Sequence, residues 1–221
     1  MGLRELKKQQ MREQIAETAW RLFSERGFDG VTVVEVARAA QVSEATVFNY
    51  FPHKEDLFYS RFEAFTEQLV EAVRTRERGE SALAAFRRRL LAPGGLLTRG
   101  EAGDAAALTQ LRTVNQVIAD SPALQAREQC SFTACADTLA ATLASESGQP
   151  AGDVTARVVA NALLGVHRAL VDHVRHRVLA DDEPARLAAE VHRLATRAFA
   201  LLEVGLRDYA AGLPHRTDIP A

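Results

Sequence analysis

The chain has few cysteines and lacks a long hydrophobic run. Its two cysteines, Cys130 and Cys135, lie five positions apart in a stretch with helical periodicity, which is neither a disulfide framework nor the CxxC spacing of a metal or redox pair. We interpret both as small core or pocket residues. No window approaches the roughly 20 uninterrupted apolar residues of a membrane span, and the charged start MGLRELKKQQMREQ lacks the apolar region of a signal peptide. These absences predict a cytoplasmic protein that does not interact with a membrane.

The chain also lacks an excess of charge of one sign. Its 27 lysines and arginines and 29 aspartates and glutamates leave a formal net charge of -2, so bulk electrostatics do not indicate a nucleic-acid partner. The positions of the cations are more informative, because four of the eight lysines and arginines in residues 1–60 lie within the first twelve residues. Cations concentrated in this way can meet phosphates even in a chain of balanced charge.

Residue groups that carry catalysis or hold a metal are missing as well. We find no nucleophile with a matching base and no paired carboxylates, so we predict that the chain is not an enzyme. Of His167, His173 and His176, only the last two share a helical face, and no cysteine or suitably placed carboxylate completes a ligand set. We therefore expect neither a metal nor a cofactor.

Helical periodicity, in contrast, extends from end to end, with almost no strand signals. We predict an all-α fold of about nine helices. Gly27 ends a long first helix, a capping box at Thr32 to Glu35 begins a short second one, and Ser43 is the N-cap of a short third one that Pro52 stops. The other predicted elements are a long helix at 54–78, a loop at 93–103, a helix that starts at Ser121-Pro122, and two long helices at about 153–178 and 182–209.

The two short capped helices, preceded by a longer helix, have the layout of a helix-turn-helix. A B-form major groove admits one helix, and the first helix of such a pair braces the second across the backbone. The small or branched apolar residues required for close packing of the two helices are present at Val36, Ala37, Ala40, Val42 and Val47.

The run IAETAWRLFSERGFDGVTVVEVARAAQVSEATVFNYFPHKEDLF, residues 15–58, resembles the DNA-binding domain of the tetracycline-repressor (TetR) family along its whole length. The resemblance covers roughly the first quarter of the chain. It includes the LF-x-E-x-GF end of the first helix, the T-x-x-x-[IV]-A start of the second, the VS-x-x-T turn and the NYF-x-x-KE-x-L exit. Beyond Phe58 the resemblance is to the family's helical architecture only.

The resemblance implies a role for each matching residue. Thr32 matches a position that touches phosphate at the start of the second helix. Ser43 caps the recognition helix, Thr46 matches its usual phosphate- or base-touching threonine, and Tyr50 and Lys54 match a phosphate-binding tyrosine and lysine. We expect no packing role for Tyr50 and Lys54. The candidates for base contact, from their places on the recognition helix, are Glu44, Ala45, Phe48 and Asn49.

Two of these residues depart from the family pattern. A lysine or arginine is common where this chain has Glu44, and a tyrosine where it has Phe48. Glu44 can accept from a cytosine amino group, and the Phe48 ring suits a thymine methyl group. The alternative for Phe48 is a packing role under the turn. The family's operator sequences are therefore not transferable to this chain.

The last two predicted helices offer a face for a second copy of the chain, which a palindromic operator would require. Two such helices from each subunit would form a four-helix bundle. The alternative is that these residues form an intramolecular core. The predicted interface residues are Val159, Leu163, Val166, Leu170, Val174, Leu194, Leu201 and Leu202.

Members of this family usually hold a small molecule among their middle helices, which implies an effector pocket here. Few charges interrupt the apolar faces of these helices, so a largely apolar ligand is favoured. The alternative for these residues is ordinary core. The candidate pocket residues are Phe62, Phe65, Leu69, Phe86, Leu111, Val114, Phe132, Cys135 and Leu139.

The sequence thus predicts a helix-turn-helix DNA-binding domain at residues 1–53, a helical ligand-binding and dimerisation domain at 54–212 and a flexible tail at 213–221. Its expected function is that of a sequence-specific transcription regulator. We predict a homodimeric repressor that leaves a palindromic operator, a double-stranded DNA site, when a small apolar effector binds. The alternative is a helical protein-binding adaptor without ligand control, which would explain the amphipathic C-terminal helices but not the match in residues 15–58.

Overall fold

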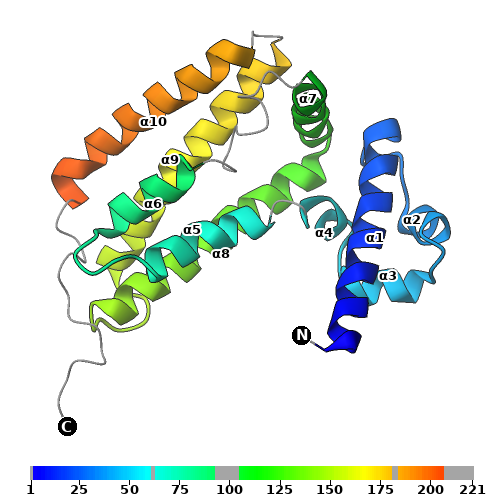
Figure 1. The fold of residues 1–221 in the computed structure, drawn as a ribbon, viewed down its shortest axis with the longest axis horizontal. Coiled ribbons are helices and arrows are strands. Elements are labelled where there is room, and N and C mark those ends of the chain that lie inside the picture. The colour runs from blue at the N-terminus through cyan, green and yellow to red at the C-terminus, as the bar shows by residue number, and fades with distance from the viewer. Residues whose placement is uncertain (1, 61–62, 93–104, 181–183, 207–221) are drawn as a thin grey trace. The chain divides into compact units, whose positions relative to one another are not determined.

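The computed structural model describes residues 2–60, 63–92, 105–180 and 184–206, and within them it contains ten α-helices and no strand (Figure 1). The all-α prediction is confirmed. The expected single helix at 54–78 is wrong, because this stretch contains α4 (Lys54–Tyr59) and α5 (Glu63–Arg74). At the end of α4 the Ser60 hydroxyl donates to the Leu57 carbonyl at 3.1 Å. A serine that occupies a main-chain carbonyl in this way competes with helix continuation.

The helices divide into two compact units, residues 1–64 with 113–128 (unit 1) and residues 65–112 with 129–221 (unit 2). As a packing unit, the first therefore extends beyond the predicted domain end at residue 53. The reason is that Leu57, Phe58 and Tyr59 of α4 are buried in the same core as the first helix. The predicted flexible tail at 213–221 and the predicted loop at 93–103 lie outside the described residues.

Unit 1 is built on α1 (Leu3–Arg26), α2 (Val33–Ala39), α3 (Glu44–Tyr50) and α4. Gly27 ends α1 as predicted, with a positive φ of 74° and its amide donating to the Phe23 carbonyl. Aromatic rings fill the centre: the Phe23 and Phe28 centroids are 5.0 Å apart, and the Phe58 ring lies edge-on to Phe28 at 6.3 Å. Tilted and edge-on arrangements of this kind add to the free energy of burial.

Unit 1 also includes the junction between α7 (Ala105–Ala119) and α8 (Pro122–Glu146). The Tyr59 hydroxyl donates to the Leu124 carbonyl at 2.9 Å, and Arg127 pairs with the Asp56 carboxylate, also at 2.9 Å. Pro122 is the first residue of α8, as predicted. Helix α8 therefore begins in the core of unit 1 and continues into unit 2.

Unit 2 contains α5, α6 (Ala82–Leu90), most of α8, α9 (Val154–Leu179) and α10 (Pro184–Leu206). Helices α9 and α10 run antiparallel and pack side by side (Figure 1). Helix α9 is long and apolar enough to cross a membrane by length and composition alone, which is weak evidence, since core helices of soluble proteins pass the same test. One face of α9 belongs to the core of unit 2, where Leu163 and Leu164 are buried.

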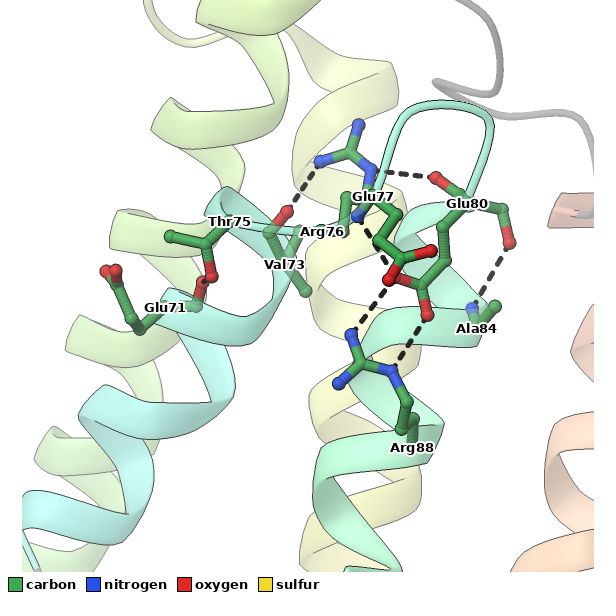
Figure 2. Close-up of polar contacts among 9 residues, drawn as sticks. Glu71, Val73, Thr75, Arg76, Glu77, Glu80, Ala84 and Arg88 are labelled. Carbon is green, nitrogen blue, oxygen red and sulfur yellow. Dashed lines mark hydrogen bonds and ion pairs between the residues drawn. The ribbon is translucent and has the colours of Figure 1, made fainter.

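The connection between α5 and α6 is held by two arginines, as Figure 2 shows. Arg76 donates to the Val73 carbonyl at 2.6 Å and to the Glu80 carbonyl at 3.0 Å, which bridges the turn. Arg88, in the last turn of α6, donates to both carboxylate oxygens of Glu80 at 3.0 Å. The Arg88 hydrogen bonds hold the pKa of Glu80 below its usual value.

Candidate nucleic-acid interface

The start of α2 is a complete capping box, as predicted. The Thr32 hydroxyl accepts from the Glu35 amide at 3.3 Å, and the Glu35 carboxylate accepts from the Thr32 amide at 2.8 Å. Arg26 adds an ion pair with Glu35 at 2.8 Å. The Thr32 amide, followed by the Arg26 side chain, lowers the pKa of Glu35 to about 2. Thr32 itself is exposed, at a helix N-terminus where a phosphate can approach.

This capping box predicts acid sensitivity in unit 1. Because the folded-state pKa of Glu35 is below its unfolded value of 4.5, the stability from the ionised carboxylate is present above pH 4.5 and is lost as the pH falls toward 2. Glu35→Gln should therefore reduce the fall in thermal midpoint between pH 5.5 and 3. Thr32→Ala, which removes the N-cap hydroxyl, should lower the free energy of unfolding by about 1 kcal/mol at neutral pH. Thermal unfolding followed by the fluorescence of Trp20, the chain's single tryptophan, checks both. Glu25→Gln, at an exposed position on α1, is the control, and an unchanged pH dependence in Glu35→Gln would contradict the prediction.

The turn into α3 positions the predicted recognition helix. Gln41 adopts a positive φ of 59°, and the Val42 amide donates to the Ala37 carbonyl at 3.0 Å. The Ser43 hydroxyl accepts from the Thr46 amide at 3.0 Å, which confirms Ser43 as the N-cap. The predicted packing between the two helices is also present, since Val36, Ala37, Ala40 and Val47 are buried and Val42 is partly buried.

The outer face of α3 is free of the unit's core. Glu44, Ala45, Phe48 and Asn49 are all exposed. Phe48 keeps 43% of its surface exposed, so the alternative of a ring packed under the turn does not hold. A single exposed apolar side chain is normal on a protein surface, so it is the position of Phe48 on the outer face of the second helix of a helix-turn-helix that indicates a DNA contact.

The exit from α3 differs from the sequence-based prediction. Tyr50 is half-buried against the core of unit 1. The Lys54 ammonium donates to the Phe28 carbonyl at 2.7 Å and lies 4.1 Å from the centroid of the Phe28 ring. Burial lowers the pKa of Lys54. Both residues thus have a packing role, and the expectation that they have none is wrong, because Gly27 turns the chain so that Phe28 lies under Lys54.

Cations at the start of α1 add to this interface. Arg4, Lys7 and Lys8 are exposed. Arg12 is partly buried, with its guanidinium 4.9 Å from the centroid of the Phe51 ring. Phe51 is 1% exposed and belongs to the core. The cation-rich start of the chain is therefore linked to the end of α3 by a cation–π contact.

The predicted effector-pocket residues do not form a single group. Phe62 lies outside the described residues, and Val114 packs against the core of unit 1. The other seven belong to unit 2. Leu69, Phe86, Cys135 and Leu139 are buried in its core, and Phe65, Leu111 and Phe132 are partly buried. Burial raises the pKa of the Cys135 thiol to about 11.

A surface depression of about 280 Å³ lies elsewhere on unit 2. It is lined by none of the predicted pocket residues. Its walls carry two arginines and a glutamate in addition to apolar side chains. The lining residues are Ser81, Leu83, Ala84, Arg87, Arg88, Leu91 and Glu203.

Half of the eight predicted dimer-interface residues are buried within one chain. Val159, Leu163, Leu170 and Val174 are at most 5% exposed, so they form the intramolecular core that was the alternative. Val166, Leu194 and Leu202 are partly buried against that core. Leu201, in contrast, is 82% exposed. The opposite face of α9 and the end of α10 carry further exposed apolar side chains, at Val154, Val158 and Val204.

Comparisons with known proteins agree with this arrangement. The family model "Bacterial regulatory proteins, tetR family" matches residues 15–60, and the model "MftR C-terminal domain" matches residues 96–207, which is half of the chain. TcmR of Streptomyces glaucescens, an HTH-type transcriptional regulator, is 32% identical over 45% of this chain and 44% of TcmR. The mycofactocin biosynthesis regulator MftR of Mycobacterium tuberculosis is 27% identical over 72% of this chain and 77% of MftR. The match thus spans less than half the length of TcmR.

Solved structures show the same fold. A tetR-family regulator from Mesorhizobium loti superposes with a TM-score of 0.51 at 20% identity, covering 89% of this chain and 96% of that one. SmeT, in a complex with triclosan, superposes with a TM-score of 0.55 at 18% identity, covering 96% of this chain and 99% of SmeT. From the helix-turn-helix in unit 1 and the two family models, we conclude that the chain belongs to the tetR family of bacterial transcription regulators.

Proposed function

We propose that this DNA-binding regulator is a cytoplasmic repressor that binds a palindromic operator as a homodimer and leaves it when a small, largely apolar effector binds in unit 2. The observation that carries the proposal is the exposed outer face of α3, with Phe48 43% exposed on a helix capped by Ser43. A capped helix of two turns that presents polar and apolar side chains to solvent suits insertion into a major groove.

The hydroxyls at the N-terminus of α3 suit phosphate contacts. The Ser43 and Thr46 hydroxyl oxygens are 2.7 Å apart and share one hydrogen bond. Whichever hydroxyl accepts in this pair keeps its own proton free to donate to a phosphate oxygen. Phosphate contacts fix the register of the helix on the duplex, and Glu44, Ala45, Phe48 and Asn49 would then meet base edges.

A mobility-shift titration with the DNA upstream of the chain's own gene tests this proposal. Asn49→Ala should change which sequences are preferred, because a side chain that meets a base edge contributes about 1–3 kcal/mol of discrimination. Tyr50→Phe should weaken binding to all sequences similarly, because it removes a phosphate donor. Gln116→Ala, at an exposed position on α7, is the control. Unchanged binding and sequence preference in both α3 variants would contradict the assignment of α3, and failure to select any sequence from a random DNA pool would favour the adaptor function.

A second copy of the chain is the proposed occupant of the outer face of α9 and α10. Val154, Val158, Leu201 and Val204 are between 59% and 89% exposed. They lie toward the start of α9 and the end of α10, which are at the same end of the antiparallel helix pair (Figure 1). Gly165, two turns after Val158 on the same face, leaves room for close approach, since a Cβ atom there would meet nothing within 4 Å. Regulators of this family dimerise, and one α3 per copy would match the two half-sites of a palindrome.

Ligand control is supported by the apolar core of unit 2. SmeT, which has the same fold, binds triclosan, so this helical scaffold accommodates a small molecule in that protein. In the present chain Phe65, Leu111 and Phe132 are the predicted pocket residues of unit 2 that are only partly buried. A ligand that binds the DNA-free state about 1,000-fold better would release the operator, which corresponds to about 4 kcal/mol.

A further inference from the structure

The core of unit 2 contains a buried histidine with an unsatisfied ring nitrogen. His167 of α9 is 4% exposed. Within the described part of the chain its Nδ1 atom has neither a hydrogen-bond partner nor access to solvent. A buried polar atom without a partner is rare, because it loses its hydrogen bond to water on folding and no protein hydrogen bond offsets that cost.

Two aromatic rings flank this histidine. The Phe65 ring of α5 lies edge-on at 5.6 Å and the Phe132 ring of α8 lies edge-on at 5.4 Å, measured between ring centroids. Both rings are partly exposed while His167 is buried. The Phe65 ring also lies under the Arg89 guanidinium, 5.0 Å from the ring centroid.

His167 and the Cys135 thiol, both buried in unit 2, carry no charge at neutral pH. Burial lowers the pKa of His167 to about 4 and raises that of the Cys135 thiol to about 11, so both side chains are neutral. A neutral imidazole accepts one hydrogen bond and donates one. The other buried residues in the hydrophobic core of unit 2 are aliphatic or aromatic.

Neither a metal nor a water molecule suits this nitrogen. Among the described residues no group of three histidine, cysteine, aspartate or glutamate side chains is placed to hold a metal ion. A buried water usually needs two to four polar partners, and Nδ1 offers one. A ligand that brings a single polar group on an apolar body would satisfy the nitrogen and also fill the aromatic surroundings.

We propose that His167 is the polar anchor of the effector site, and that the effector is a neutral aromatic compound with one hydroxyl group. Its ring lies between Phe65 and Phe132, and its hydroxyl forms a hydrogen bond with Nδ1 of His167. This inference rests on the ligand control proposed above and names the chemistry of that ligand. It also assigns a role to a residue outside the set of pocket residues predicted from the sequence.

Binding of 1-naphthol to the purified full-length protein, measured by calorimetry without DNA, tests the inference. Naphthalene, which lacks the hydroxyl group, is the matched ligand. We expect 1-naphthol to bind about tenfold more tightly than naphthalene, because naphthalene cannot form the hydrogen bond to the otherwise unsatisfied Nδ1 atom. His167→Phe keeps an aromatic ring and removes the nitrogen, so it should bind both compounds with equal affinity. His176→Phe, at an exposed position on the same helix, should keep the preference of the wild type.

A second measurement does not depend on the folding of a variant. In protein labelled with ¹⁵N-histidine, 1-naphthol should shift the Nδ1 resonance of His167 and naphthalene should not. Absence of 1-naphthol binding to the wild type, an equal affinity for both compounds, or an unshifted Nδ1 resonance at saturation would overturn the proposal. Because neither measurement contains DNA, their results are independent of the mobility-shift test of the proposed function.

Discussion

Replacing both Val158 and Val204 with arginine is expected to convert the protein from a dimer into a monomer and to weaken operator binding at least about 100-fold. Val158 is 59% exposed and Val204 is 89% exposed in a single chain, so the substitutions leave the core of unit 2 intact. In the proposed dimer the arginines of the two copies would be buried close to one another, and unpaired buried charges are strongly unfavourable. A monomer that holds one half-site loses the gain in affinity from holding two.

Gly165→Leu separates the loss of the dimer from a loss of folding. In the single chain a Cβ atom at this position meets nothing within 4 Å, and the backbone is helical. Replacing a helical glycine should even stabilise the monomer, by roughly 0.5–1 kcal/mol. The same side chain would hold two copies apart, so the variant should combine a higher thermal midpoint at low protein concentration with weaker dimerisation.

Sedimentation velocity and mobility-shift titrations on the same samples measure the two effects of these substitutions. Ala134→Arg, at an exposed position on α8, is the control and should remain dimeric with unchanged operator affinity. A double arginine variant that stays dimeric would show that the second copy binds elsewhere. A monomeric variant with unchanged operator affinity would instead contradict the requirement for two recognition helices.

The dimer face shows what helical periodicity can and cannot predict. The strongest apolar stripe of α9, which includes Val159 and Leu163, is real, but it faces the core of its own chain. The outer stripe is mixed, with Asn161 between Val158 and Gly165. A hydrophobic stripe indicates that a helix face is buried, but it does not indicate whether the same chain or a second copy covers that face.

Features that depend on neighbouring residues were predicted well. The capping box at Thr32, the N-cap at Ser43 and the stop at Gly27 are each formed within a few residues of chain, so the sequence contains all of their parts. The contact of Lys54 with the Phe28 carbonyl joins residues 26 positions apart. The bond between Tyr59 and Leu124 joins residues 65 positions apart. Neither contact has a local signal, and this is why the extent of unit 1 and the packing role of Lys54 were missed.

The buried histidine was missed for a related reason. In the sequence His167 is one of three histidines of α9, and it does not share a helical face with the other two. Its burial and its missing partner arise from α5 and α8, which supply Phe65 and Phe132. Only the packed structure distinguishes it from the exposed His176.

Acidification from pH 6.5 to pH 4 should cost unit 2 about 3 kcal/mol of stability through His167 alone. Burial lowers the folded-state pKa of His167 from 6.5 to about 4. In this range the unfolded chain binds a proton at His167 and the folded chain does not, so its contribution is fully present above pH 6.5 and is lost as the pH falls toward 4. Below the folded-state pKa both states are protonated and the loss levels off.

His167→Phe removes the titrating group, so the difference in unfolding free energy between this variant and the wild type should change with pH in that range and be constant above it. This difference is measured by urea unfolding with far-UV circular dichroism as the signal, because Trp20, the single tryptophan, lies in unit 1 and does not report on unit 2. The carboxylates that titrate in both proteins contribute equally to the two unfolding free energies, so their contributions cancel in the difference. His176→Phe should follow the wild type at every pH, since that side chain is exposed. A constant difference between wild type and His167→Phe from pH 7 to pH 4 would mean that His167 takes up its proton at the same pH in the folded and the unfolded chain. That result would contradict a histidine that stays neutral in the folded protein down to about pH 4.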